Sequence, residues 1–156
     1  MIQRKQTIYL FLAVVLSVVC LCLPLGSIEL QSMGLEPVLY NLSLVIPHNN
    51  TASYDFSYCP LFVLLAIPTI IALVAIFLYR NRPLQARLCA FNLLFLLLWM
   101  LLLAYHKFFG FSAFKPCTFQ QTLTSYLPFL AAVCNYLAFK GIRADERLVR
   151  AADRIR

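Results

Sequence analysis

Charged side chains are scarce in this sequence. Of its 156 residues, 12% are Asp, Glu, Lys or Arg and 62% are hydrophobic, whereas soluble domains have about a quarter charged and about half apolar residues. A chain of this composition could not cover its own core with polar surface, which excludes an ordinary soluble domain. The composition predicts that a bilayer surrounds most of the chain, and the length allows one domain.

Motifs for catalysis and metal binding are missing as well. None of the six cysteines stands in a C-x-x-C or zinc-knuckle spacing. The histidines, His48 and His106, are isolated and have no acidic partner at ligand spacing. Nothing resembles a nucleotide-binding loop, a serine triad or a pair of catalytic carboxylates. The sequence therefore predicts a non-enzymatic protein with no catalytic residue, no metal ligand and no cofactor.

What the sequence does contain is four long runs without a formal charge. Each has about 18 to 20 residues, and a helix needs about 20 to cross the hydrocarbon core of a bilayer. Helices are the expected form because backbone polar groups in lipid must be satisfied within the segment. The runs lie at residues 8–25, 60–79, 88–105 and 122–139. The sequence thus predicts an all-α membrane protein with four transmembrane helices.

Basic residues collect on one side of these runs. Eleven of the 13 Lys and Arg residues lie at the N-terminus, in the connection at residues 80–87 or after residue 139, and two, Lys107 and Lys115, lie on the other side. Basic flanks resist translocation, so the eleven are expected in the cytoplasm. A multi-pass topology with cytoplasmic N- and C-termini follows.

The first outer segment, about Gly26 to Cys59, is too long for a plain turn. Residues 37–46 within it are apolar and partly alternating, which is typical of a short strand or hairpin. We expect a small extracytoplasmic strand or hairpin cap on the bundle. Two Asn-x-Ser/Thr sequons, at Asn41 and Asn49, fall here and would matter only in a eukaryotic secretory pathway.

Two cysteines, Cys59 and Cys117, stand at the predicted outer boundary, each beside a proline. An oxidising exterior would allow them to form a disulfide that ties the two outer loops together. The other four lie in the uncharged runs and are expected to be small apolar fillers.

Ionisable residues are absent from the four runs, which speaks against an ion or proton pathway. Asn92 and Asn135 are among their few polar residues. We expect these two to make hydrogen bonds between helices, worth about 1 kcal/mol each.

The last residues, 141–156, predict a helix with three stripes. Successive residues turn by about 100°, which gathers one kind of side chain on each stripe. The arginine stripe consists of Arg143, Arg147, Arg150 and Arg154. The apolar stripe consists of Ala144, Leu148, Ala151, Ala152 and Ile155. The acidic residues Asp145, Glu146 and Asp153 lie around the remaining side. Gly141 is expected to let the chain turn, so residues 1–140 are predicted as the transmembrane domain and 141–156 as a basic amphipathic cytoplasmic tail.

Four uses of this tail compete. The arginine stripe could lie on anionic lipid headgroups, with the apolar stripe in the interface. It could dock on a protein partner. Nucleic acid is not expected, because the basic stripe has no interleaved aromatic residues. A solvated topology anchor is the plainest interpretation, but an unattached helix would not need the apolar stripe.

The two ends of the chain, "MIQRKQTIYLFLA" and "RADERLVRAADRIR", resemble the ends of a family of four-span inner-membrane proteins from Bacteroidota. That family is catalogued as a domain of unknown function. The resemblance implies a bacterial inner membrane and no assigned activity, and it carries no catalytic residue across.

The sequence as a whole favours an accessory, assembly or partner-binding subunit of the membrane that docks through its basic tail. Its expected partners are the bilayer with its anionic headgroups and a protein, which could be a second copy of the chain. A small oligomeric transporter or channel is the alternative. A membrane thiol oxidoreductase is less favoured, because such enzymes use a C-x-x-C motif near the membrane surface.

Overall fold

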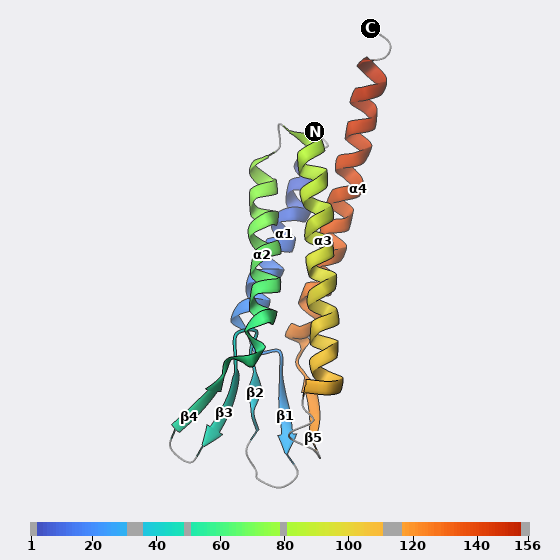
Figure 1. Cartoon of the computed structure of the whole chain (residues 1–156). Coiled ribbons are helices and arrows are strands. Elements are labelled where there is room, and N and C mark those ends of the chain that lie inside the picture. Colours follow the sequence, from blue (N-terminus) through green and yellow to red (C-terminus); the bar gives the residue numbers. More distant parts are fainter. Residues whose placement is uncertain (1–2, 31–35, 49–50, 79–80, 111–116, 154–156) are drawn as a thin grey trace.

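The structure is a computed structural model that describes residues 3–30, 36–48, 51–78, 81–110 and 117–153. Within these ranges, four long helices stand side by side and a five-stranded sheet covers one end of the bundle (Figure 1). α1 and α3 begin and α2 ends at the opposite end, and α4 extends past it (Figure 1). The basic segments of the sequence therefore gather at the end of the bundle that is far from the sheet.

The helices follow the apolar runs closely. They are α1 (Gln3–Cys22), α2 (Cys59–Phe77), α3 (Arg82–Tyr105) and α4 (Leu127–Asp153). Pro60 and Pro83 lie in the first turns of α2 and α3, where a missing backbone N–H costs nothing. Short helical turns extend three of these ends: η1 (Phe56–Tyr58) precedes α2, the π-helical η2 (His106–Gly110) follows α3, and η4 (Leu123–Tyr126) precedes α4.

The prediction of four membrane-spanning helices is wrong. Among the described residues, two helical segments are long and apolar enough to cross a membrane, Phe56–Phe77 with 22 residues and Arg82–Gly110 with 29. The apolar part of α1, Gln6–Cys22, is shorter, because the chain leaves the helix before residue 25. The fourth predicted run opens with a 3₁₀ turn, so the apolar α-helical stretch of α4 begins only at residue 127.

The all-α expectation is wrong too, because the cap is a full antiparallel sheet. Its strands are β1 (Gly26–Leu30), β2 (Val38–Leu39), β3 (Leu44–His48), β4 (Thr51–Asp55) and β5 (Cys117–Gln121), in the order β4-β3-β2-β1-β5. The predicted hairpin at residues 37–46 is present as β2 and β3. β5 comes from the second outer segment and pairs with β1, with Gly26 opposite Gln121.

The pairing of β1 with β5 follows from the helices to which they are attached. β1 leaves the end of α1, and β5 leads into α4. Because α1 packs along α4, the two extended segments begin next to each other. Gly26 is required where they meet, since a Cβ there would overlap the backbone oxygen of Gln120 on β5 and would lie 2.7 Å from the Phe119 ring.

One apolar core joins the sheet to the bundle. Leu25, Ile28 and Leu39 are fully buried against helix residues that include Leu65 and Trp99. A second core lies at the opposite end of the bundle. Its buried members are Leu10, Ala75, Ala86, Cys89, Ala138 and Ile142.

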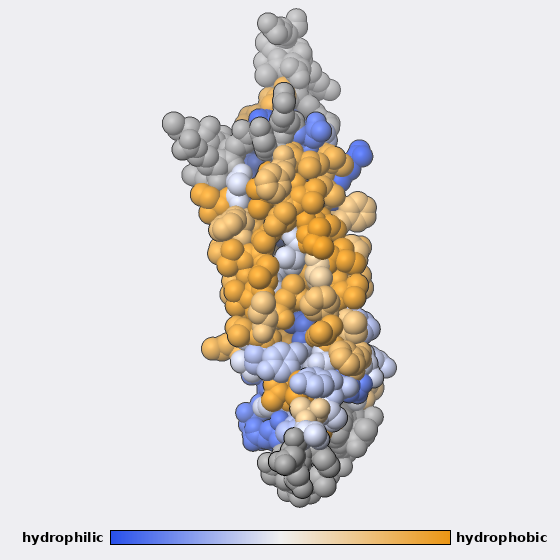
Figure 2. All heavy atoms as spheres, turned by 90° about the vertical axis from the view of Figure 1, so that its left-hand side faces the viewer, coloured by the Kyte–Doolittle hydropathy of each residue, from blue (hydrophilic) through white to orange (hydrophobic). Residues whose placement is uncertain are grey.

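On the face that Figure 2 shows, a belt of apolar side chains covers the helices between two more polar zones. Ile70, Phe77 and Leu101 are between 62% and 72% exposed. Large exposed apolar patches mark surfaces that meet lipid or another protein. The belt therefore supports membrane association, although two rather than four helices meet the length and composition required to cross.

Candidate functional site

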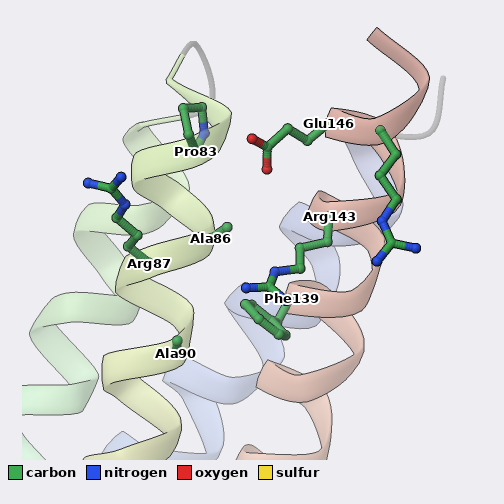
Figure 3. A pocket seen from close by; sticks show the side chains of 8 residues that line it. Pro83, Ala86, Arg87, Ala90, Phe139, Arg143 and Glu146 are labelled. Carbon is green, nitrogen blue, oxygen red and sulfur yellow. The ribbon is translucent and has the colours of Figure 1, made fainter. Parts of the chain in front are cut away.

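A basic groove opens between the start of α3 and the charged half of α4, and we call it the arginine groove (Figure 3). Its volume is about 380 Å³. Its lining residues are Pro83, Ala86, Arg87, Ala90, Phe139, Arg143, Glu146 and Arg147. α3 thus contributes one arginine and mostly small side chains, and α4 contributes two arginines, one carboxylate and one aromatic ring.

Arg143 is the best-positioned cation of the groove. Its guanidinium carbon lies 4.7 Å from the centre of the Phe139 ring, one turn earlier on α4. A cation over an aromatic face is attracted by the ring quadrupole. Arg143 and Glu146 both reach from α4 toward α3, whereas the Arg87 side chain extends away from α4 along the side of α3 (Figure 3).

A second, smaller cavity of about 280 Å³ adjoins the groove on α4. It is lined by Tyr136, Phe139, Lys140, Arg143, Ala144 and Arg147. Phe139, Arg143 and Arg147 line both cavities. The two hollows therefore form one cationic region around these three side chains.

The arginine stripe of the sequence is found only in part. Arg143 and Arg147 are exposed on α4 and line the groove. The side chain of Arg150 and the whole of Arg154 lie outside the described residues. The sequence did not indicate Arg87 as a third cation of the groove, because Arg87 lies on α3 and only tertiary packing brings it near the arginines of α4.

The base of the tail holds a buried carboxylate that the sequence analysis did not single out. Asp145 is 8% exposed and its Oδ2 accepts a hydrogen bond of 2.7 Å from Nε2 of Gln6 on α1. Helical periodicity could have indicated its burial, because Asp145 lies three residues after buried Ile142 and seven after buried Ala138 on the same face of α4.

Gly141, expected to turn the chain, lies inside α4 instead. A Cβ at this position would come within 3.1 Å of the Gln6 side chain. Its small size thus lets α1 approach α4, and the predicted boundary at residue 140 falls within one continuous helix.

The two buried asparagines, Asn92 on α3 and Asn135 on α4, differ in their bonds. Asn135 is fully buried and its Nδ2 donates to the backbone oxygen of Cys89 on α3, at 3.1 Å. Asn92 is 2% exposed, and its Oδ1 has no hydrogen-bond partner in the described structure. The Oδ1 of Asn135 also lacks one.

The predicted bond between Cys59 and Cys117 finds no support. Cys59 is a free thiol at the start of α2. The side chain of Cys117 lies outside the described residues, but its backbone belongs to β5, at the opposite edge of the sheet from β4, which leads into α2. A disulfide needs Cα atoms within about 7 Å.

The described residues contain no cluster of side chains that could bind a metal ion. Among the described residues, no three His, Cys, Asp or Glu side chains lie close enough together to hold an ion. The side chain of His48 is outside these residues, and His106 packs against the ring of Tyr58 with centroids 4.9 Å apart. The arginine groove is therefore the strongest candidate site.

Comparison with protein families identifies the family of the chain. A family model described as Domain of unknown function (DUF4293) matches residues 2–155. No curated protein matches the chain. The match covers both end motifs and confirms the expected resemblance to a family of unknown function, while it says nothing of source organism or number of spans.

Proposed function

Because the chain belongs to this family, whose description assigns no activity, we propose a function from the geometry: an accessory subunit of the bacterial inner membrane that holds a partner protein through the exposed end of α4. We propose that the protein itself catalyses no reaction. Its role is to present a fixed cationic and apolar helix at the cytoplasmic surface.

The membrane placement is supported by the belt and by the charges. The belt lies between the sheet and the basic end of the bundle (Figure 2). The connection at residues 80–87 and the charged half of α4 both belong to that basic end. Lys and Arg favour the cytoplasmic side, so we place this end of the bundle, with the connection between the spanning helices α2 and α3, in the cytoplasm and the sheet outside.

The docking role rests on one observation, which is that α4 continues past the rest of the bundle (Figure 1). Leu148 is 63% exposed and Val149 is 45% exposed on this extension. A solvated helix would not need apolar side chains there, and within the described residues no other helix covers them. Arg147 is exposed beside them. A partner surface with an apolar centre and an acidic rim would complement this end of α4.

Truncation tests the docking role most directly. A stop after Arg147 removes the extension but keeps Ile142 and Asp145, which pack in the bundle. We expect the truncated protein to insert in the membrane normally and to lose the stoichiometric partner that the full chain retains in purification from native membranes. Leu148→Gln in the full chain should weaken recovery of the same partner.

Leu123→Gln is the matched control, because Leu123 is 83% exposed but lies at the sheet end. Recovery of every partner by both the truncated protein and Leu148→Gln would overturn the proposal. Recovery of a second copy of the chain alone would replace a foreign partner with self-association.

The orientation has its own test. In a cysteine-free background, Ser53→Cys on exposed β4 should react with a membrane-impermeant thiol reagent added outside intact cells. Ala151→Cys, exposed near the end of α4, should react only after the cells are opened. The opposite pattern would contradict the proposed placement.

A further inference from the structure

We infer that the arginine groove binds the phosphodiester headgroup of an anionic phospholipid that carries hydroxyl groups, phosphatidylglycerol being the simplest. The inference rests on the membrane placement proposed above, but it does not depend on the docking role of α4. It assigns a ligand class to a cavity at the boundary between the apolar belt and the basic end.

The charge of the groove favours an anion. The residues that line it include three arginines, Arg87, Arg143 and Arg147, and one carboxylate, Glu146. Guanidinium groups match phosphate oxygens with paired hydrogen bonds and shed water more readily than an ammonium group. A zwitterionic headgroup would leave this excess of positive charge uncompensated.

The groove is also partly organised before a ligand arrives. The Phe139 ring holds the Arg143 guanidinium at 4.7 Å and the side chain points toward α3 (Figure 3). A fixed cation loses less conformational entropy on binding than a mobile one. Arg87 is exposed, so its long side chain can change rotamer to approach the same phosphate.

The size and the polar groups fit a small headgroup. The volume of about 380 Å³ falls within the range of about 300–1,000 Å³ found for ligand pockets. Small side chains, Ala86 and Ala90, form the α3 wall. The Glu146 carboxylate lines the same space and can accept a hydrogen bond from a headgroup hydroxyl, which a simple phosphate does not offer.

Apolar tracks lead away from the groove toward the sheet, and they distinguish a lipid from a free phosphate. Steps of three or four residues from Ala90 and from Phe139 stay on the groove side of α3 and α4. The side chains on these steps are all at least 43% exposed: Leu94, Leu97 and Leu101 on α3, and Tyr136, Val133 and Phe129 on α4. Acyl chains attached to a headgroup in the groove would lie along these tracks.

The test uses the full chain in lipid nanodiscs of phosphatidylcholine that contain a small fraction of phosphatidylglycerol or of phosphatidylethanolamine. Native mass spectrometry of the released protein measures which lipid it retains. We expect selective retention of phosphatidylglycerol. Arg143→Gln should reduce that retention about fivefold, in line with the contribution of one basic residue near an anionic surface.

Arg82→Gln is the matched control, because it removes an arginine from the first turn of α3 that does not line the groove. Equal losses from Arg143→Gln and Arg82→Gln would show only general surface charge and would overturn the site. Arg143→Lys keeps the charge without the planar fork, and we expect it to fold like the wild type and to retain less lipid. Retention unchanged in Arg143→Lys and Arg143→Gln would also overturn it.

Two further measurements complete the test. One distinguishes a lipid phosphate from free inorganic phosphate, and the other tests the role of the Glu146 carboxylate. Inorganic phosphate at millimolar concentration should not displace the retained lipid, and displacement would indicate a site for free phosphate. Glu146→Gln should lower retention of phosphatidylglycerol relative to phosphatidic acid, and an unchanged ratio would contradict the hydroxyl contact. A chain that does not enter nanodiscs would contradict the membrane placement itself, whereas entry without lipid selectivity would contradict the groove alone.

Discussion

Trp99 and Asn41 are joined by a hydrogen bond where the sheet meets the bundle: the indole Nε1 donates to the amide Oδ1 at 3.1 Å. Asn41 is fully buried in the turn between β2 and β3, and its Nδ2 donates to the backbone oxygen of Cys20 at 2.7 Å. The last carbonyls of a helix have no partner within it. One side chain therefore satisfies the end of α1 and fastens the sheet to α3.

Replacement of Asn41 should loosen this junction. Asn41→Ala leaves the Cys20 carbonyl and the Trp99 indole N–H without partners in a buried place. We expect the free energy of unfolding to fall by about 2–4 kcal/mol, because each unsatisfied buried group costs about 1–3 kcal/mol. The chain has a single tryptophan, so Trp99 fluorescence in detergent reports the unfolding and the polarity of the junction.

Leu42→Ala is the control for this change, because Leu42 lies in the same turn but is exposed. We expect it to change stability by about 0.5 kcal/mol or less. If Asn41→Ala and Leu42→Ala were equally stable, the bridge to Trp99 would not contribute as described.

The close approach of α1 to α4 gives a second prediction. Gly141→Val places a branched side chain where even a Cβ lies 3.1 Å from Gln6. We expect the free energy of unfolding to fall by about 1–3 kcal/mol, as for other overpacked sites. Thermal unfolding in detergent measures the change.

Shortening the neighbour should reverse part of that loss. In a Gln6→Ala background, Gly141→Val should cost less than it does in the wild type, because the crowded side chain is gone. Equal costs in the two backgrounds would mean that Gly141 is not needed for the approach of these helices. Gln6→Ala alone tests the bond to Asp145, since it leaves the buried carboxylate without its donor at 2.7 Å.

The helices could be predicted from sequence because their signal is local. The uncharged runs located α2 to within two residues and the end of α3 at Tyr105, although α3 begins six residues before its run. The hairpin at residues 37–46 was visible in the same way. Apolarity alone, however, did not distinguish helix from 3₁₀ turn or irregular chain at the ends of the runs, which made the count of spanning helices too high.

Long-range features could not be read in this way. β1 and β5 are separated by most of the chain, and their pairing depends on α1 lying beside α4. The sequon at Asn41 predicts an exposed acceptor, whereas the fold buries this side chain completely. A short motif has no information about which face of a turn will meet a helix.

The α4 side of the arginine groove could be predicted from the sequence, and its α3 side could not. Arg143 and Arg147 were found from helical periodicity, which needs no tertiary structure. The apolar stripe was expected to meet the lipid interface or a partner, and Leu148 of that stripe stays exposed within the chain, while Ile142 and Asp145 lie on the buried face of α4. Which face of α4 is covered is decided by α1, and periodicity does not specify the neighbour.

Acid should weaken the turn before α2. The Oδ1 of Asp55 accepts bonds of 3.0 Å from the Ser57 N–H and 2.6 Å from the Ser57 hydroxyl. The Ser57 side-chain and backbone bonds hold the pKa of Asp55 below its usual value. The stability gained is therefore fully present above the usual aspartate pKa, and it is lost as the pH falls through the lowered pKa of the folded state.

Asp55→Ala tests this cap. We expect it to lower the free energy of unfolding at pH 7 by about 0.5–1 kcal/mol, at the small end for a helix cap because the carboxylate is near solvent. The difference from wild type should shrink as the pH falls below about 4. Thermal unfolding at several pH values measures it, and a difference that is independent of pH would contradict the cap.

The unequal bonding of Asn92 and Asn135 gives the last prediction. Asn92 buries an Oδ1 without a partner, so Asn92→Leu removes an uncompensated polar atom and should leave stability unchanged or raise it by about 1 kcal/mol. Asn135→Leu also removes an unpartnered Oδ1 but loses the bond to the Cys89 carbonyl. We expect Asn135→Leu to be less stable than Asn92→Leu by about 1 kcal/mol. Thermal unfolding of both variants and of the wild type in one detergent measures the difference. A melting temperature of Asn92→Leu below that of the wild type would show that the Asn92 amide has a partner in the protein's own membrane assembly or solvent.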